Sequence, residues 1–302
     1  MTYHFRPALT SESKPLVGLY SESGCGKTYS ALLLARGFAG PTGRVGMIET
    51  EGGRGEAYAD LIPGGYDVLS IRGNYAPKEY GAAITAAESA NLAVLIIDSA
   101  SHEWEGVGGV LAMAAENQAA GKKGVLVWQQ PKMEHQRHFM GRLISTPIPL
   151  VIVCMRAKYP MQEDKVKREW VRSDRLEPKQ SEDILFEMFA HGWIDREHKF
   201  RGTKYTRPDW RGILKDGEPI TLETGQRLAE WSRDPTRPTS PPDEIACDRA
   251  ARLSVCKEIA REQKWTRAQW ATAWTKACGE ATESNVDPSA LADLERVIRS
   301  AA

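Results

Sequence analysis

The stretch P-L-V-G-L-Y-S-E-S-G-C-G-K-T, residues 15–28, decides the fold of this 302-residue chain. Its apolar part, Leu16–Tyr20, predicts a buried strand, and Tyr29–Phe38 predicts a helix. A short loop rich in Ser and Gly joins the two. Strand, glycine-rich loop and helix in this order are typical of a phosphate-binding loop, because backbone N–H groups and the positive end of the helix dipole then surround phosphate oxygens.

The residue types in the loop suit a nucleoside triphosphate. Lys27 is expected to reach the β- and γ-phosphates and to act in catalysis, and the Thr28 hydroxyl is expected to bind Mg²⁺. The pattern G-x-x-x-x-G-K-[ST] begins with Gly, whereas this chain has Ser21 at that position. An ordinary glycine-rich turn is the alternative, but two later segments favour ATP and Mg²⁺ as cofactors. The predicted nucleotide-binding residues are Ser23, Gly24, Cys25, Gly26, Lys27, Thr28 and Tyr29.

Four more apolar runs follow at 44–48, 67–71, 92–97 and 150–155. Helices are predicted at 77–91 and 111–120, and a further one is opened by Pro131, with Phe139, Met140, Leu143 and Ile144 on one face. Continuous apolar strands that alternate with helices indicate a parallel sheet buried on both faces. The run 92–97 ends in Asp98, which would emerge beside the loop as the second Mg²⁺ anchor. Residues 102–109 are interpreted as a glycine-rich loop.

The chain changes character after Arg156. Residues 158–179 are highly charged, and a β-rich region is predicted from Ile184–Ala190 onward, with a turn near 196–197 and a last helix at 224–233. The segment 234–243 has four prolines in ten residues, which predicts a semi-rigid linker. Three helices should follow, one opened by a capping box at Thr266 and one with Asp287 as N-cap. The predicted domains are 1–233, the linker 234–243, and 244–302.

Composition limits the classes of function. Lys and Arg total 40 and Asp and Glu total 40, so any nucleic-acid surface must be local. The five cysteines are scattered without a C-x-x-C pair, which favours a reducing compartment and no structural metal. The start M-T-Y-H-F-R-P lacks a signal-peptide pattern, and no 18-residue apolar span occurs. A cytoplasmic protein with no membrane contact is expected.

Three segments together resemble the core of RecA-like ATPases: S-G-C-G-K-T at 23–28, M-I-E-T-E at 47–51 and I-I-D-S at 96–99. The chain is most similar to phage-encoded RecA-like ATPases linked to recombination and single-strand annealing, a group that Arg156 and the segment 176–188 also resemble. The resemblance covers roughly residues 14–210 and leaves out the C-terminal helices. It implies a RecA-like P-loop fold, ATP hydrolysis on single-stranded DNA in the host cytoplasm, and assembly into a homo-oligomer, either ring or filament.

The resemblance also assigns catalytic roles. Glu51 would be the general base that activates the attacking water, with Glu49 supporting it, and Glu103 is the rival base, as in other P-loop ATPases. A solvated carboxylate at the strand end is the alternative for Glu51. Arg156 would be catalytic, sensing the γ-phosphate or acting across a subunit boundary, and a structural ion pair is its alternative.

In the family that the chain resembles, the loop after the last motif strand contacts DNA. Here the cations available to meet phosphates are Lys158, Lys165, Lys167, Arg168, Arg172 and Arg175. Tyr159 or Trp170 would stack on bases. The acids Glu163, Asp164, Glu169 and Asp174 dilute this charge, so a solvated hairpin is the alternative.

The C-terminal helices carry Trp265, Trp270 and Trp274. Aromatic residues four apart on a short helix are more typical of a core than of a nucleic-acid surface. This bundle is a candidate for recruiting a single-strand-binding protein or another recombination partner.

Three functions remain open. The first is Mg-dependent ATP hydrolysis on single-stranded DNA during phage recombination, annealing or replication. The second is a nucleotide-gated scaffold or switch that recruits a protein partner and hydrolyses ATP slowly. The third, a kinase for a small metabolite, is weakened because the sequence has no obvious lid. DNA stimulation of the ATPase would separate the first from the others, and a phosphorylated product would identify the third.

Overall fold

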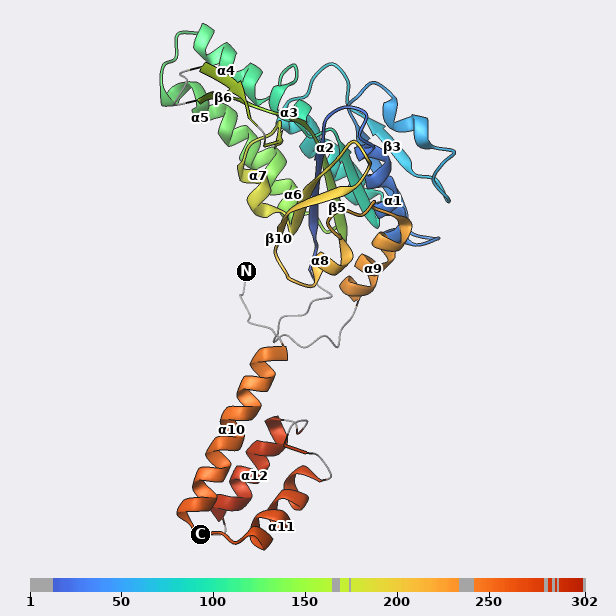
Figure 1. The fold of residues 1–302 in the computed structure, drawn as a ribbon. Helices are drawn as coiled ribbons and strands as arrows, with labels where there is room; N and C mark the ends of the chain where they lie inside the picture. The colour runs from blue at the N-terminus through green and yellow to red at the C-terminus, as the bar shows by residue number, and fades with distance from the viewer. Residues whose placement is uncertain are drawn as a thin grey trace. The chain divides into compact units, whose positions relative to one another are not determined.

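The structure, a computed structural model shown in Figure 1, describes residues 13–164, 169–173, 175–233, 242–279, 282–283, 286 and 288–300. The described chain divides into two compact units, one within residues 13–233 and one within residues 242–300. Most of the predicted linker therefore lies outside the described residues. Within the described residues, no helix combines the length and the apolarity needed to cross a membrane.

The first unit is built on one mainly parallel sheet with the strand order β10-β9-β1-β5-β4-β2-β3. Every neighbouring pair in this order is parallel except β9 and β10. A short strand, β8 (Glu177–Pro178), pairs antiparallel with the end of β5. The strands of the main order are β1 (Leu16–Ser21), β2 (Val45–Glu49), β3 (Asp67–Ser70), β4 (Val94–Asp98), β5 (Leu150–Lys158), β9 (Ala190–Ile194) and β10 (Phe200–Tyr205).

Helices cover both faces of this sheet, as the continuous apolar strands predict. In β1, Val17 and Leu19 join one core with α1 (Lys27–Ala39) and α9 (Leu222–Arg233), while Leu16 and Tyr20 join the other with α2 (Pro77–Ser89) and α6 (Gly141–Ser145). Helices α1 and α9 approach closely at Gly37, where a Cβ would lie 2.0 Å from the carbonyl oxygen of Leu222. The predicted α/β architecture with a sheet flanked by helices is confirmed.

Four local expectations were wrong. Residues 102–109 are not all loop, because the helix α3 (Ser101–Glu105) begins shortly after β4 ends at Asp98. Pro131 does not open its helix: α5 begins at Val125 and runs to Glu134, followed by a π-helical turn, η3 (His135–Met140). Ile144 is 57% exposed, although Phe139, Met140 and Leu143 are buried as predicted.

The fourth error concerns residues 184–190, which begin as the helix α7 (Asp183–Glu187) and reach β9 only at Ala190. A short apolar run does not distinguish a strand from one helical turn. The remaining helices of this unit are α4 (Val110–Ala119), α8 (Trp210–Ile213) and the 3₁₀ turn η2 (Arg54–Tyr58).

The charged region after Arg156 contains a separate two-stranded hairpin of β6 (Met161–Asp164) and β7 (Glu169–Arg172). Its register pairs Met161 with Arg172 and Glu163 with Trp170. Directly opposed residues share one face of an antiparallel pair, so Trp170 and Arg172 lie on the same face.

The second unit is a small helical bundle of α10 (Pro242–Glu262), α11 (Arg267–Cys278) and α12 (Pro288–Ser300). Helix α10 begins inside the segment predicted as linker. The capping box at Thr266 and Gln269 is confirmed, whereas Asp287 lies outside the described residues. The core contains Cys256, Leu291, Leu294 and Ile298, and Trp265, Trp270 and Trp274 pack against it, as the core interpretation predicted.

Candidate nucleotide-binding site

A cavity of about 750 Å³ opens at the carboxyl edge of the sheet, where β1 passes into the glycine-rich loop. This volume is within the usual range for small-molecule sites. All seven predicted nucleotide-binding residues, from Ser23 to Tyr29, line it. The other walls come from the segment after β2, from the end of β5 and from the β9–β10 turn, so segments far apart in the sequence complete the site.

The backbone of the loop requires glycine. Gly24 and Gly26 both have φ of 85°, in the left-handed region that L side chains rarely adopt. A Cβ on Gly26 would in addition lie 2.8 Å from Nδ1 of His198. The His198 ring is held there by a 2.9 Å hydrogen bond between its Nδ1 and the carbonyl of Cys25. The β9–β10 turn therefore supports the loop in the conformation that leaves its inner side open.

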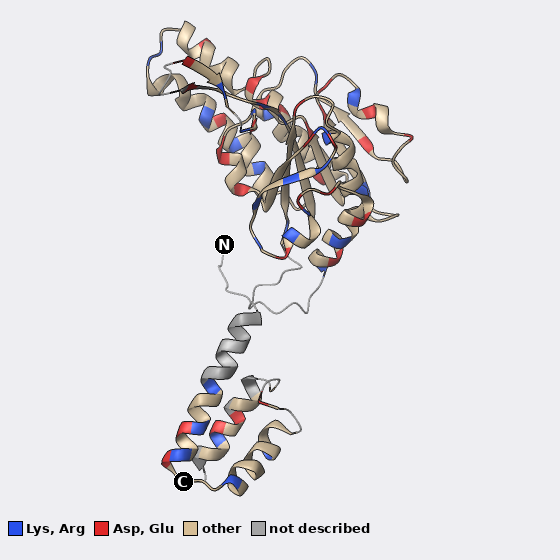
Figure 2. Ribbon diagram, in the orientation of Figure 1, with Lys and Arg blue, Asp and Glu red and all other residues tan. Residues whose placement is uncertain are grey.

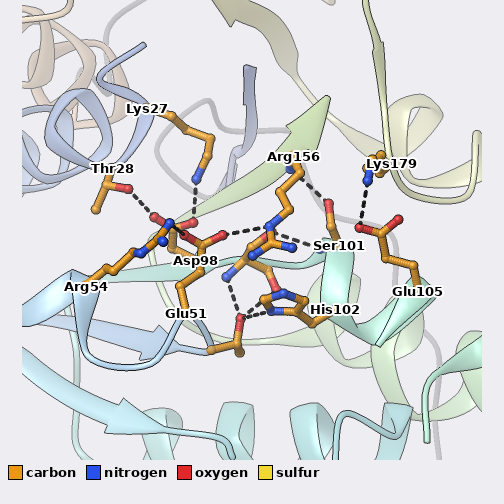
Figure 3. A network of polar contacts seen from close by, with 12 residues as sticks. Lys27, Thr28, Glu51, Arg54, Asp98, Ser101, His102, Glu105, Arg156 and Lys179 are labelled. Carbon is orange, nitrogen blue, oxygen red and sulfur yellow. Dashed lines mark hydrogen bonds and ion pairs between the residues drawn. The ribbon is translucent and has the colours of Figure 1, made fainter. Parts of the chain in front are cut away.

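Lys27 and Thr28, which line the cavity, both contact the buried Asp98 (Figure 3). Nζ of Lys27 lies 2.5 Å from Oδ1 of Asp98, and the Thr28 hydroxyl donates to Oδ2 over 2.6 Å. Burial by itself lowers the pKa of Lys27, but the opposite charge of Asp98 outweighs it, so the pKa is raised and the ammonium persists. The structure thus brings together the three residues predicted to bind phosphate and Mg²⁺.

These residues fit a magnesium ion bound together with phosphate. Mg²⁺ prefers oxygen ligands and is usually held by one or two carboxylates plus phosphate oxygens and water, without an all-protein cage. The Thr28 hydroxyl and the Asp98 carboxylate supply such a partial set. The described residues contain no cluster of three or more His, Cys, Asp or Glu side chains that could hold a metal ion.

The sheet register explains the meeting of distant residues. Strand β5 lies between β1 and β4, with Arg156 opposite Ser21 of the loop strand. On the far side of β4, Asp98 lies opposite Glu49. Because parallel strands end at one edge, the carboxyl ends of β1, β5, β4 and β2 lie next to one another at the edge where the cavity opens.

Glu51 faces the cavity and is paired with Arg156. Nε of Arg156 donates to Oε1 of Glu51 over 2.9 Å, and Arg54 lies 3.8 Å from the other oxygen. Glu49 is 1% exposed and accepts the backbone N–H of Glu51 over 2.6 Å. Glu49 therefore supports Glu51 through the backbone.

Glu103, the rival base, points elsewhere. Its side chain is fully buried, and its oxygens contact Nδ1 of His135 at 2.9 Å and Nε2 of Gln180 at 3.2 Å. It does not line the cavity. Of the two predicted candidates for general base, Glu51 is the one with access to a bound nucleotide.

Thr50 lies between Glu49 and Glu51 and connects the segment after β2 to the end of β4 by hydrogen bonds. Its N–H donates to the carbonyl of Asp98 over 3.0 Å, and its hydroxyl oxygen accepts the N–H of Ser99 over 2.8 Å. The same oxygen lies 2.7 Å from Nδ1 of His102, whose ring packs against Tyr75. Burial and then the charge of Arg156 lower the pKa of His102, so this ring is neutral at neutral pH.

Several cavity residues escaped the sequence interpretation. Tyr58 is one of them and stacks on the predicted Tyr29, with ring centroids 6.0 Å apart, and Leu61 is an apolar residue of the same lining. Tyr58 is the aromatic residue at the end of the segment G-G-R-G-E-A-Y, residues 52–58, and this was the one sign of it in the sequence. His198 and Lys179 follow from tertiary structure alone, and no sequence pattern pointed to them.

The predicted DNA-contacting residues are only partly described. Lys158 is exposed at the end of β5, and Arg172 lies on β7, while Lys165, Lys167 and Arg168 fall outside the described residues. Trp170 is 69% exposed. Figure 2 shows positive and negative residues interspersed over this unit, in keeping with the zero net charge.

Comparison with known proteins adds little. No protein-family model matches the chain, and no curated protein matches it. Among solved structures, it is similar to a prototypical ATPase from the type III secretion system of pathogenic bacteria, with 12% identity, a TM-score of 0.39, and coverage of 94% of this chain and 81% of the other. It is also similar to the assembled ATPase EscN from the type III secretion system of enteropathogenic E. coli, with 13% identity, a TM-score of 0.39, and coverage of 94% and 67%.

Similarity at that level identifies no relative, so we assign the class of the protein from its own geometry. The sheet, the loop and the Lys27–Asp98–Thr28 cluster define an α/β protein with a phosphate-binding loop. The cavity at the carboxyl edge is large enough for a nucleotide.

Proposed function

We propose that this chain is a Mg-dependent ATPase that acts on single-stranded DNA in recombination, annealing or replication, as its resemblance to phage RecA-like ATPases implies. The observation that carries the ATPase part is that one cavity is lined by Lys27 and Thr28, both bonded to the buried Asp98, and by Glu51 with Arg156. Phosphate ligands and a candidate base therefore face the same space.

Each group of residues has a separate role in the proposed reaction. The loop backbone and Lys27 bind the β- and γ-phosphates, and Tyr29, Tyr58 and Leu61 wall the part of the cavity suited to a base. Thr28 and Asp98 would hold Mg²⁺, which when bound would neutralise phosphate charge. Glu51 orients the attacking water and takes its proton.

In this structure Arg156 is hydrogen-bonded to Glu51. This bond has to break before the Glu51 carboxylate can activate water. A γ-phosphate offers Arg156 a bidentate anionic partner, which an arginine prefers in planar, doubly hydrogen-bonded geometry. Nucleotide binding would thus free the base and place a cation on the transferred group at the same moment.

The proposal for DNA rests on the β6–β7 hairpin. Its exposed Trp170 and Arg172 share one face, which combines a stacking surface with a cation, the pairing that sequence-independent single-strand binding uses. Lys158 precedes the hairpin, and the sequence between its two strands adds Lys165, Lys167 and Arg168, which lie outside the described residues. We further propose a homo-oligomer, ring or filament, because Arg156 is 41% exposed and therefore accessible to a neighbouring site.

The test is ATP hydrolysis with and without single-stranded DNA, in wild type and Lys27→Ala. Loss of the buried ammonium should remove ATP binding at micromolar concentrations, and DNA should raise wild-type turnover. ATP affinity of Lys27→Ala near the wild-type value, measured by calorimetry, would refute the site. Turnover that does not respond to DNA would refute the DNA part alone.

One observation favours a second candidate, a nucleotide-gated scaffold or switch with slow hydrolysis. The Glu51–Arg156 pair holds the base in an inactive arrangement, and such an arrangement is what a switch requires in its resting state. Tight ATP binding with a single turnover over hours, together with ATP-dependent capture of a protein through the C-terminal bundle, would support the switch over the DNA-dependent ATPase.

A further inference from the structure

A second, smaller cleft of about 270 Å³ adjoins the phosphate loop and shares Glu22 and Cys25 with the nucleotide cavity. Tyr159, at the entrance to the β6–β7 hairpin, forms one side together with Leu176. Trp193 of β9 and Arg196 of the β9–β10 turn form the other. The cleft thus joins the loop, the hairpin and the turn, and nothing in the proposed hydrolysis uses it.

Glu22 holds two arginines at this cleft. One of its carboxylate oxygens lies 3.4 Å from a terminal nitrogen of Arg172 and the other lies 3.3 Å from Arg196. The arginine side chains are 61% and 83% exposed, so solvent screens both pairs and each is weak. A phosphate group matches the arginine fork better than a single distant carboxylate oxygen, because it accepts two parallel hydrogen bonds.

The remaining walls suit a flat apolar ring. The Arg172 guanidinium lies 4.1 Å from the centre of the Tyr159 ring, which keeps the two side chains together. Leu176 is 8% exposed, and Trp193 is partly buried. The volume accommodates one nucleobase and is about a third of the nucleotide cavity, so a second nucleoside triphosphate does not fit.

We propose that this cleft binds one nucleotide unit of single-stranded DNA. The base lies against Tyr159 and Trp193, and the phosphate replaces the Glu22 carboxylate as the partner of Arg172 and Arg196. The inference rests on the proposed function and adds to it a base-binding site. Glu22 lies three residues before Cys25 of the phosphate loop, and both line the nucleotide cavity. Release of Glu22 from its two arginines therefore couples strand binding to that cavity.

The first arm of the test separates base from backbone. Binding of the full chain to fluorescent oligo-dT and to an abasic strand of the same length is measured by anisotropy at low salt, without nucleotide. Tyr159→Ala should weaken oligo-dT binding by about five- to 150-fold, the range of one lost stacking contact, and should leave the weaker abasic binding within about twofold. Tyr159→Phe keeps the ring and should bind both strands like wild type.

The second arm concerns Glu22. Glu22→Gln removes the competitor for both arginines and should tighten oligo-dT binding by about two- to thirtyfold, the equivalent of two surface ion pairs. Glu197→Gln is the matched control, since it removes the same charge from the same cleft while Glu197 pairs with Lys199 and not with either arginine. Its effect should be less than half as large.

The outcomes are distinct. Equal losses on both strands for Tyr159→Ala, or equal gains for Glu22→Gln and Glu197→Gln, would overturn the cleft assignment while single-strand binding itself stands. Absence of wild-type binding to either strand, with ATP hydrolysis intact, would overturn the proposed DNA function and the cleft with it. Circular dichroism of each variant verifies that the fold is retained.

Discussion

Arg156 reaches across from the end of β5 and donates from Nε to Oε1 of Glu51, 105 residues earlier in the chain, over 2.9 Å. The pair links the two residues that the resemblance assigns to base and phosphate sensor. Arg156 is further fixed by its backbone, because its N–H donates to the Ser101 hydroxyl over 2.9 Å and its carbonyl accepts from Lys179 over 2.7 Å. The side chain alone is therefore free to exchange Glu51 for a phosphate.

Replacement of Arg156 tests this exchange. Arg156→Ala should lower kcat by about tenfold or more, since a cation that meets the transferred phosphoryl group is lost, and should change ATP affinity by only a few fold. Arg156→Lys should recover part of the rate, because the charge returns without the planar fork. Steady-state kinetics and thermal unfolding are measured together. If the pair is only structural, the unfolding temperature falls while kcat per folded molecule stays at the wild-type value.

The sequence predicted the parts of the site that lie within one local pattern. The loop, Asp98 at the end of an apolar strand and Glu51 after another are each strand-end features, and parallel strands place such ends along one edge. The positions of His198, Gln180 and Lys179 depend on where β8, β9 and β10 join the sheet. No periodicity in the sequence predicts that arrangement. Glu103 shows the limit most clearly, because its sequence position beside Asp98 suits a base, whereas its burial against His135 became visible only in the structure.

His191 should make the stability of the first unit depend on pH. It is 5% exposed in β9, and its Nδ1 has no hydrogen-bond partner within the described residues. Burial, then the charges of Lys204 and Arg175, lower its pKa to about 4. An unfolded chain with an ordinary histidine pKa of about 6.5 binds this proton first, so the free energy of unfolding falls as pH drops from about 6.5 toward 4, by up to roughly 3 kcal/mol.

Urea unfolding between pH 7 and 4.5, followed by tryptophan fluorescence, measures this slope. His191→Gln should flatten it, although the variant is less stable at pH 7. His138→Gln changes a histidine whose side chain is 35% exposed and serves as the control. Parallel slopes for wild type and His191→Gln would contradict the assignment of the acid sensitivity to His191.

The cations between β6 and β7 give a prediction about salt. Replacing Lys165, Lys167 and Arg168 together by Ala should weaken single-stranded DNA binding for every sequence. It should also flatten the slope of log affinity against log salt by up to about 0.7 per lost phosphate contact. Replacing Lys215, Arg227 and Arg233 removes the same charge elsewhere in the unit and should leave the slope unchanged. Equal slopes for the first variant and wild type would move the DNA surface away from the hairpin.

Glu51→Gln separates a catalytic role of E-T-E from a structural one. The amide keeps the size of the side chain and can still accept a hydrogen bond from Nε of Arg156, but it no longer takes a proton from water. Lys27, Thr28 and Asp98 are untouched, so ATP and Mg²⁺ should bind within a few fold of wild type. Turnover should fall by about 10²-fold or more, the usual size of a general-base contribution, and the ATP-bound assembly should become long-lived.

Glu103→Gln is the matched comparison, because it removes the same charge from a carboxylate just beyond the same strand. Its oxygens bind His135 and Gln180 and do not reach the cavity, so we expect a loss of stability with kcat per folded molecule nearly unchanged. Rapid-quench measurement of a single turnover, with the folded fraction determined for each variant, isolates the chemical step from product release. If Glu103→Gln abolishes that step while Glu51→Gln proceeds at the wild-type rate, the base is Glu103, and the Arg156–Glu51 pair is a structural ion pair at the rim of the site.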